Sequence, residues 1–228
     1  MRTEDEGALW SLRRELVQLH HELVRWGLVV WTAGNVSARV PGSDLLLIKP
    51  SGVLHDELTP ESMVLCDLHG RPVEDNGFAA SSDTASHAYV YRHREDVGGV
   101  VHTHSPYACA FAAVGEPVPC VLTGIADEFG GEIPIGPFAT IGSEDIGRGI
   151  VNTLEGSRSR AVLMQNHGVF TIGPDPSSAV KAAVLCEDSA RAVHLARALG
   201  TPIPIEPAAI DALHERYRNV YGQPDDSC

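Results

Sequence analysis

The sequence is poor in basic residues and in cysteine, and it contains no long hydrophobic run. Only 17 lysines and arginines stand against 30 aspartates and glutamates, which gives a formal net charge of −13. A net negative charge of this size repels nucleic acids and anionic membranes, so local groups have to capture any anionic substrate. No stretch approaches the roughly 18 apolar residues that cross a bilayer, and the first residues lack the basic and apolar regions of a secretory signal. These absences predict a cytoplasmic protein.

The five cysteines are odd in number and widely spaced, and none belongs to a Cys-x-x-Cys pair: Cys66, Cys109, Cys120, Cys186 and Cys228. This pattern argues against a disulfide framework and against a zinc site built from thiolates, and it suits a reducing compartment. Cys109 lies nearest to the histidines described below. Its alanine neighbours indicate helix packing, so we expect this thiol to be inert.

The residues that are present are typical of a compact globular enzyme. The chain has 228 residues, of which 43% are hydrophobic and 21% are charged, and it contains 22 glycines. No shift in composition, internal repeat or low-complexity segment divides it. A single domain over residues 1–228 is therefore predicted.

Hydrophobic periodicity predicts alternating helices and strands. Leucines at spacings of three and four from Leu9 predict a long first helix that Gly27 ends. A hairpin is expected from strands at 35–40 and 45–49, and a second hairpin around His69 and Gly70. Later helices are expected at 84–94, 106–114, 177–199 and 208–219, with a strand at 98–104. This order predicts an α/β fold, or α+β on a strict definition, with helices covering both faces of a largely antiparallel sheet.

Three histidines lie in two apolar, strand-like stretches. His102 and His104 end the run that starts at Val97, and side chains two residues apart on a strand point to the same side. His167 follows a second apolar run and can complete a triangle. Buried imidazoles are costly unless something coordinates or hydrogen-bonds them. Because three nitrogen ligands with an open fourth position are typical of a catalytic zinc site, the trio predicts a metal centre.

The remaining histidines need not share that role. One His-x-His motif is weak support by itself, because the chain carries 11 histidines. Six lie in helix-like or turn-like segments without a partner pattern and are expected to be structural: His20, His21, His55, His69, His93 and His194.

Three short segments combine small residues with hydroxyl or amide donors: 32–35, 49–52 and 81–83. The third precedes an expected helix, whose free N–H groups and positive dipole end attract a phosphoryl group. Each segment alone could be only a turn or a helix cap. Together they predict a phosphate-binding cradle with Lys49 as its one cation. If the cradle faces the histidines, Asp83 approaches the metal as an occasional fourth ligand or as an acid/base group.

Five motifs, in this order and over nearly the whole chain, resemble those of the class II aldolase/adducin family: Gly34-Asn-Val-Ser, Lys49-Pro-Ser-Gly, Ser81-Ser-Asp-Thr, His102-Thr-His and Asn166-His-Gly. Within that family the sequence is similar to the pentulose-phosphate 4-epimerase branch, because Asp83 stands where the aldolases usually have glutamate. The segment from Ala126 to Phe129 and the ending Tyr221-Gly-Gln also resemble that branch.

The resemblance implies a three-layer αβα domain that binds Zn²⁺, or Mn²⁺ or another divalent transition metal, in a fourfold-symmetric homotetramer with sites between subunits. It implies that L-ribulose 5-phosphate and D-xylulose 5-phosphate are interconverted by breaking and re-forming the C3–C4 bond, a step of arabinose breakdown. Matching motif positions assigns the metal to His102, His104 and His167. It assigns the phosphate to Thr32, Asn35, Lys49, Ser51, Gly52, Ser81 and Ser82. Catalytic roles fall to Asp83, Asp127 and Tyr221, the last reaching from an adjacent subunit; His214 is a loose match and receives no role.

Two other functions stay open. A class II aldolase, acting for example on L-fuculose 1-phosphate, needs the same ion and cradle. A noncatalytic adducin-like scaffold keeps the fold without the chemistry. Asp83, Asp127 and Tyr221 favour the epimerase over the aldolase, and the intact histidine trio argues against the scaffold.

Overall fold

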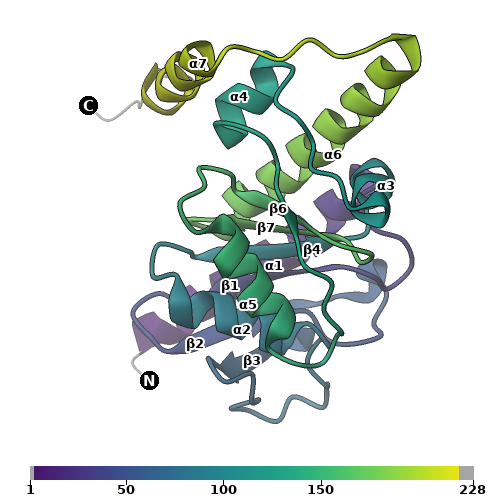
Figure 1. Ribbon diagram of the computed structural model, residues 1–228. Helices are drawn as coiled ribbons and strands as arrows, with labels where there is room; N and C mark the ends of the chain where they lie inside the picture. The colour runs from purple at the N-terminus through teal and green to yellow at the C-terminus, as the bar shows by residue number, and fades with distance from the viewer. Residues whose placement is uncertain (1–2, 221–228) are drawn as a thin grey trace.

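The computed structural model describes residues 3–220, and at its centre lies a seven-stranded sheet (Figure 1). The strand order across the sheet is β3-β2-β1-β4-β7-β6-β5. Every neighbouring pair is antiparallel except β5 and β6, which are parallel. The strands are β1 (Asn35–Arg39), β2 (Leu45–Ile48), β3 (Val64–Asp67), β4 (Gly99–Thr103), β5 (Ile135–Gly136), β6 (Ala161–Met164) and β7 (Val169–Gly173). The expectation of a largely antiparallel sheet is confirmed.

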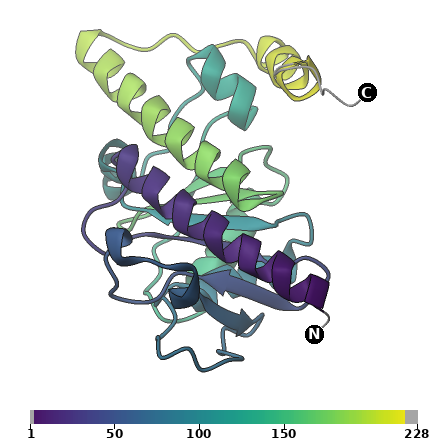
Figure 2. The ribbon, with the colours of Figure 1, turned by 180° about the vertical axis from the view of Figure 1, so that it is seen from behind.

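Helices cover both faces of the sheet, as the two opposite views in Figures 1 and 2 show. One face carries α2 (Thr84–His93) and α5 (Asp145–Leu154), and α1 (Thr3–Arg25) and α6 (Pro176–Leu199) lie across the other. On that second side α3 (Pro106–Val114) and α4 (Thr123–Phe129) pack beside α6, and α7 (Pro207–Val220) packs against α4. Two short 3-10 turns, η1 (His55–Glu57) and η2 (Pro60–Ser62), connect β2 to β3. The three-layer αβα arrangement is thus confirmed.

Successive side chains of β4 pack into the hydrophobic clusters on the two opposite faces of the sheet. Val100 packs in the cluster under α2 and α5, and Val101 packs in the cluster under α1 and α6, and both are fully buried. Successive strand residues point to opposite faces, so a strand covered on both sides is apolar along its length. Each such side chain contributes about 1.5–3 kcal/mol on burial. The strand that ends in His102 is therefore anchored from both sides.

Most expected elements occur within one or two residues of their predicted bounds, but the second hairpin is shorter than a full pair of strands. The turn at His69 and Gly70 forms, with Asp67 N–H donating to Arg71 O at 2.8 Å. The returning chain meets β3 at one isolated bridge between Cys66 and Pro72, and Val73 N–H donates to Leu65 O at 3.0 Å. The pairing ends there, so no second strand develops. None of the helices within residues 3–220 has the length and apolar character needed to cross a membrane.

Candidate metal and phosphate site

The three predicted histidines converge. One ligand nitrogen from each of His102, His104 and His167 lies within 4.8 Å of the other two. His102 Nε2 and His104 Nε2 are 3.0 Å apart. His102 is buried, His167 is half-buried and His104 is exposed. The trio therefore presents converging nitrogens at the end of β4, with one side open.

A tight turn between β6 and β7 brings the third histidine to β4. Asn166 adopts the left-handed conformation with φ 57°, and His167 N–H donates to Met164 O at 3.0 Å. Gly168 follows, where an added Cβ would lie 2.6 Å from Thr103 O and 3.1 Å from His102 Cε1. Only glycine allows the turn to press this closely against β4.

The tautomer of His102 suits metal binding. Its Nδ1 lies 3.0 Å from Val169 O, and because a carbonyl can only accept, Nδ1 carries the proton. Nε2 is then left with a free lone pair facing the other two rings. Phe170 stacks on the ring, with centroids 4.2 Å apart and planes at 14°. Burial lowers the pKa of His102 to about 3, so the imidazole is neutral at neutral pH.

The imidazoles of His104 and His167 are also neutral. Burial also lowers the pKa of His104 and of His167, which keeps both imidazoles in the neutral, ligating form. The buried Nδ1 of His167 has no hydrogen-bond partner among residues 3–220. Three neutral imidazoles with one open side fit a divalent transition-metal ion.

Asp83 faces this site instead of capping a helix. It occupies the N-cap position of α2, yet its side chain makes no cap hydrogen bond. Its Oδ2 accepts from Asn35 Nδ2 at 2.8 Å, while its buried Oδ1 has no partner within the described part of the chain. Burial alone would raise the pKa of Asp83, but electrostatic interactions with His102 and His87 and the hydrogen bond from Asn35 lower it. Asp83 is therefore a carboxylate at neutral pH.

The three cradle segments line one cavity together with two of the histidines. Its volume is about 290 Å³. Its walls include the predicted residues Thr32, Asn35, Lys49, Ser51, Gly52, Ser81, Ser82, Asp83, His102 and His104, with Ile141 at the edge. The structure thus brings all the predicted phosphate-binding positions beside the metal-binding trio, as the sequence suggested.

Lys49 supports the cradle from within. Its side chain is almost fully buried, and Nζ donates to Thr32 O at 3.3 Å and to Pro50 O at 3.2 Å. Burial lowers the pKa of Lys49 to about 8. An ammonium has three N–H groups, so one remains for a ligand.

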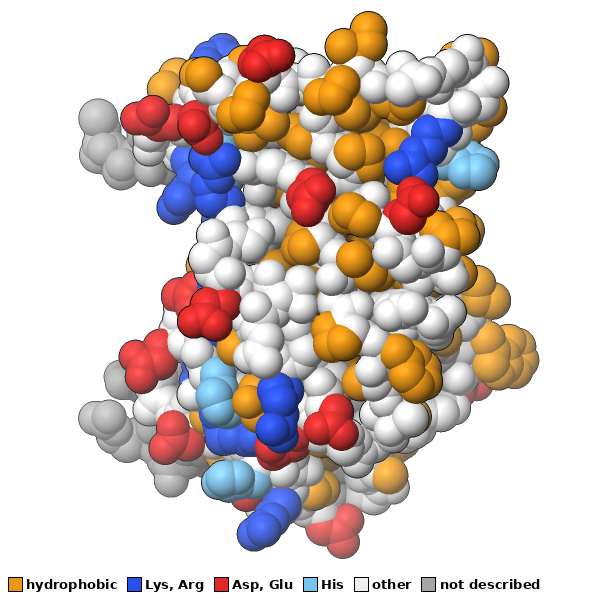
Figure 3. All heavy atoms as spheres, viewed as in Figure 1, with side chains coloured by type: hydrophobic (Ala, Val, Ile, Leu, Met, Phe, Trp, Pro, Cys, Tyr) orange, Lys and Arg blue, Asp and Glu red, His pale blue; other side chains and the backbone are white. Residues whose placement is uncertain are grey.

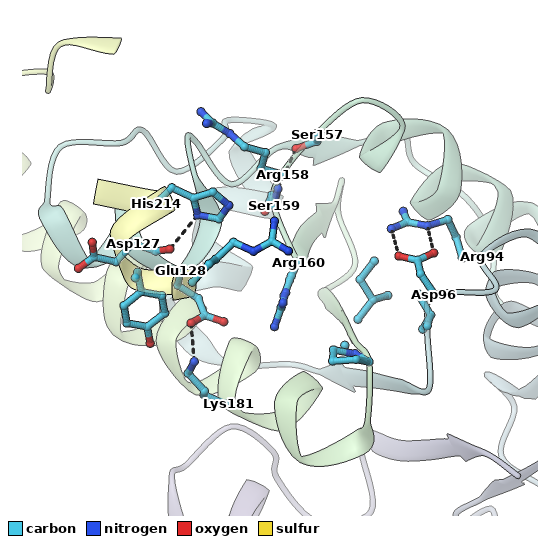
Figure 4. Close-up of a pocket in the computed structure, with 16 residues that line it drawn as sticks. Arg94, Asp96, Asp127, Glu128, Ser157, Arg158, Ser159, Arg160, Lys181 and His214 are labelled. Carbon is cyan, nitrogen blue, oxygen red and sulfur yellow. Dashed lines mark hydrogen bonds and ion pairs between the residues drawn. The ribbon is translucent and has the colours of Figure 1, made fainter. Parts of the chain in front are cut away.

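Asp127 lies elsewhere. It lines a second cavity of about 660 Å³ with Glu128, Lys181 and His214 (Figure 4). Figure 3 shows the surface hollowed between α7 and the sheet. None of the three histidines lines this cavity, and it opens beside Val97, before β4, whereas the trio lies at the end of that strand. Within one chain the structure does not bring Asp127 to the metal site, and Tyr221 lies outside the described residues.

Two contacts near this second cavity fix its shape. Glu128 is almost fully buried and pairs with Lys181 Nζ at 2.8 Å. His214 Nδ1 lies 2.9 Å from the backbone oxygen of Asp127 and donates to it. This joins α7 to α4 and places the loosely matched His214 next to Asp127.

Sequence reasoning missed His87, which lies one helical turn after Asp83. The ring is fully buried, and its Nδ1 lies 2.7 Å from Ser37 Oγ. Its electrostatic interaction with Asp83 helps to hold the pKa of that carboxyl down. The spacing of four residues on a helix was the available signal, because such residues share a face.

The chain matches known proteins over most of its length. Residues 14–194 match the family model of the class II aldolase and adducin N-terminal domain. The L-ribulose-5-phosphate 4-epimerase UlaF of Salmonella paratyphi C is 36% identical over 208 residues, covering 86% of this chain and 90% of the relative. The probable L-ribulose-5-phosphate 4-epimerase UlaF of Mycoplasma pneumoniae is 35% identical over 177 residues, covering 73% of each chain.

Solved structures agree with this result. An L-fuculose 1-phosphate aldolase superposes with a TM-score of 0.85 at 27% identity, covering 91% of this chain and 96% of that one. The L-fuculose-1-phosphate aldolase of Thermus thermophilus gives a TM-score of 0.68 at 29% identity, covering 82% of this chain and 96% of that one.

Proposed function

Because the chain belongs to the class II aldolase and adducin family, we propose that it is a metal-dependent epimerase that interconverts L-ribulose 5-phosphate and D-xylulose 5-phosphate. One observation carries the proposal: His102 and His104 line a single cavity with Asp83 and the phosphate cradle, and His167 lies beside them in the same metal-binding cluster. A phosphorylated ketose can thus be held at its phosphate while its oxygens face the metal-binding rings. The epimerase relatives cover most of this chain and support the choice of reaction.

Inversion at C4 of a 2-ketose 5-phosphate cannot begin by removing an ordinary α-proton, because C4 is not adjacent to the carbonyl. Breaking the C3–C4 bond avoids this difficulty. A divalent cation, in our proposal Zn²⁺, supplies Lewis-acid stabilisation of the charge that develops on the substrate oxygens as the bond breaks. His102, His104 and His167 would hold that cation.

The cradle residues have a distinct task in this reaction. Bond cleavage leaves an aldehyde fragment that keeps the phosphate. Asn35, Lys49 and the hydroxyls of Ser81 and Ser82 would retain it while its aldehyde group turns its other face to the nucleophilic carbon. Re-forming the bond then gives the opposite configuration at C4. Asp83 would act as an acid/base group beside the reacting oxygens, and Asn35 fixes its orientation.

Proton transfer to and from the C4 oxygen is assigned to Asp127 and Tyr221. The cavity of Asp127 shares no lining residue with the metal cavity, and the two lie at opposite ends of β4. This separation supports a homotetramer in which Asp127 of one subunit serves the metal site of the next.

A single domain over residues 1–228 and a cytoplasmic location remain predictions.

The test is incubation of the purified, zinc-loaded protein with L-ribulose 5-phosphate. We expect D-xylulose 5-phosphate to form without net release of aldehyde. The TM-score of 0.85 to an L-fuculose 1-phosphate aldolase supports a second candidate, a lyase that releases its fragments. Cleavage of L-fuculose 1-phosphate with no epimer formed from the pentulose would establish that alternative. A protein without bound divalent ion, unaffected by chelation, would favour the scaffold.

A further inference from the structure

Three buried side chains, Lys49, His55 and His20, come from different parts of the fold. They bond to the backbone of the first cradle segment, residues 32–35, and of Val36, which follows it. Lys49 Nζ, after β2, donates to Thr32 O at 3.3 Å. His55 Nε2, in η1, lies 3.1 Å from Ala33 O. His20 Nε2, on α1, accepts from Val36 N–H at 2.9 Å.

The protonation of two of these side chains follows from their partners. His20 Nδ1 lies 2.6 Å from Leu16 O, so it carries the proton and leaves Nε2 as the acceptor for Val36. Both of its nitrogens are then satisfied. For His55 the order is reversed: Ala33 O can only accept, so Nε2 carries the proton. Its buried Nδ1 has no hydrogen-bond partner among residues 3–220, so the bond to Ala33 is the one side-chain hydrogen bond of His55 within that range.

His55 is held rigidly for this contact. The residue is 4% exposed. His21 Nε2 lies 3.2 Å from His55 O, and the His20 ring lies 5.8 Å from the His55 ring. Two residues of α1 thus fix both the backbone and the ring of His55.

The segment that His55 touches has a backbone that needs support. Trp31 adopts φ 60°, a left-handed conformation that is unfavourable for a bulky residue, and Gly34 adopts φ 77°. The side chain of Trp31 is 76% exposed, so its own burial does not hold the turn. At Gly34 an added Cβ would lie 2.8 Å from His102 O, so the segment presses directly against the metal-bearing strand. The turn bond from Ala33 N–H to Val30 O at 3.1 Å and the pairing of Asn35 and Val36 with β4 fix part of this shape. The side-chain bonds to the carbonyls of Thr32 and Ala33 hold the stretch between them.

We propose that His55 is a positioning residue for phosphate binding: its Nε2–H bond to Ala33 O sets the orientation of Thr32 and Asn35, which flank Ala33 and line the cavity. The inference rests on the proposed function in taking the ligand to be a phosphorylated sugar. Loss of the bond lets the strained turn relax and moves Thr32 and Asn35 away from the phosphate. His102 ends on β4, His104 follows that strand and His167 lies in the β6–β7 turn, and none of the three bonds to His55, so we expect the metal content not to depend on His55.

The experiment compares the zinc-loaded full-length protein with His55→Leu, His55→Gln and His55→Asn, using calorimetric titration with inorganic phosphate. The amide nitrogen of glutamine can occupy the place of Nε2, whereas that of asparagine falls short and leucine has no donor. The leucine and asparagine variants should bind phosphate about tenfold more weakly, the effect of one hydrogen bond. His55→Gln should stay within about threefold of the wild type. Exposed His69, replaced by leucine, is the matched control and should change nothing.

Steady-state kinetics add a readout that general destabilisation would not give. In the leucine and asparagine variants KM for L-ribulose 5-phosphate should rise about tenfold while kcat and bound zinc per subunit stay nearly constant. Unchanged phosphate affinity in His55→Leu would overturn the inference. Equally weakened phosphate binding in the glutamine and asparagine variants would also overturn the inference. This comparison remains a test if the leucine variant does not fold.

The two proposals fail separately. If the wild type binds phosphate in a His55-dependent way but forms no epimer, the proposed reaction is wrong and the positioning role stands. If the epimer forms and the His55 variants bind phosphate normally, the positioning role alone is wrong.

Discussion

Asn35 Nδ2 donates a hydrogen bond to Asp83 Oδ2 at 2.8 Å, and this contact joins the phosphate cradle to the carboxylate beside the metal-binding rings. Asn35 also stands directly opposite His102 in the pairing of β1 with β4. Its amide nitrogen lies 3.1 Å from Ser81 Oγ as well. A single amide therefore contacts the carboxylate and a cradle hydroxyl, so the position of the phosphate and the orientation of Asp83 are coupled.

Replacement of Asp83 by asparagine tests the carboxylate. The amide keeps the shape and can still bond to Asn35, but it carries no charge and cannot accept a proton. We expect kcat to fall by about 10²–10⁴-fold, the range for loss of an acid/base group, with little change in KM. Stopped assays of D-xylulose 5-phosphate measure this. Full turnover in the variant would remove Asp83 from the mechanism.

Lys49 gives the site a predicted pH dependence. Burial lowers the pKa of its ammonium to about 8 in the ligand-free protein, so the positive charge is present below that pH and is lost above it. Because kcat/KM reports groups of the free enzyme, kcat/KM for the phosphorylated substrate should fall as the pH rises through about 8. Lys49→Met should have a lower kcat/KM and lack this alkaline decline. An identical decline in both proteins would assign the titration to another group.

Mixed oligomers test whether sites lie between subunits. Asp127→Asn should retain the metal and lose most of its turnover, and His102→Ala should lose the metal. In a ring formed from equal amounts of both, about a quarter of the interfaces combine an intact His102 with an intact Asp127, so about a quarter of the activity should return. Co-expression with two affinity tags isolates the mixed rings. Absence of any recovery would place Asp127 in the same chain's site or outside catalysis.

Gly168→Ala should damage the metal site through packing alone. Its Cβ would lie 2.6 Å from Thr103 O and 3.1 Å from His102 Cε1, so the β6–β7 turn has to move away from β4. We expect a loss of about 1–3 kcal/mol in the free energy of unfolding, measured by urea denaturation, together with weaker zinc binding. Gly124→Ala is the matched control, because nothing lies within 4 Å of its Cβ. Equal zinc affinity in both variants would show that the turn is not fixed by this contact.

The strand that carries His102 and leads into His104 could be predicted from the sequence, because alternation along a strand is a local property. His167 could not be joined to them by local rules. Its approach depends on the register of β4 with β7, in which His102 pairs with Phe170, across more than 60 residues of chain. The two apolar runs only suggested that His167 completes the triangle, and the motif resemblance supported it.

Two features lay beyond any reading of local pattern. The placement of Asp127 in the second cavity depends on the packing of α4 against α6 and α7, which no periodicity within α4 specifies. His55 was expected to be structural, since a histidine in a turn has no signature for a bond to Ala33 O, a backbone atom 22 residues earlier in the chain. In both cases the tertiary arrangement decides which groups meet.

The most direct test of the account measures bound metal per subunit and formation of D-xylulose 5-phosphate in the same preparations. The wild type is compared with a variant in which His102, His104 and His167 are all replaced by alanine. The account predicts one divalent ion per subunit and turnover in the wild type, and neither in the variant, with folding of both confirmed by circular dichroism. Undiminished epimer formation by the triple variant would contradict it.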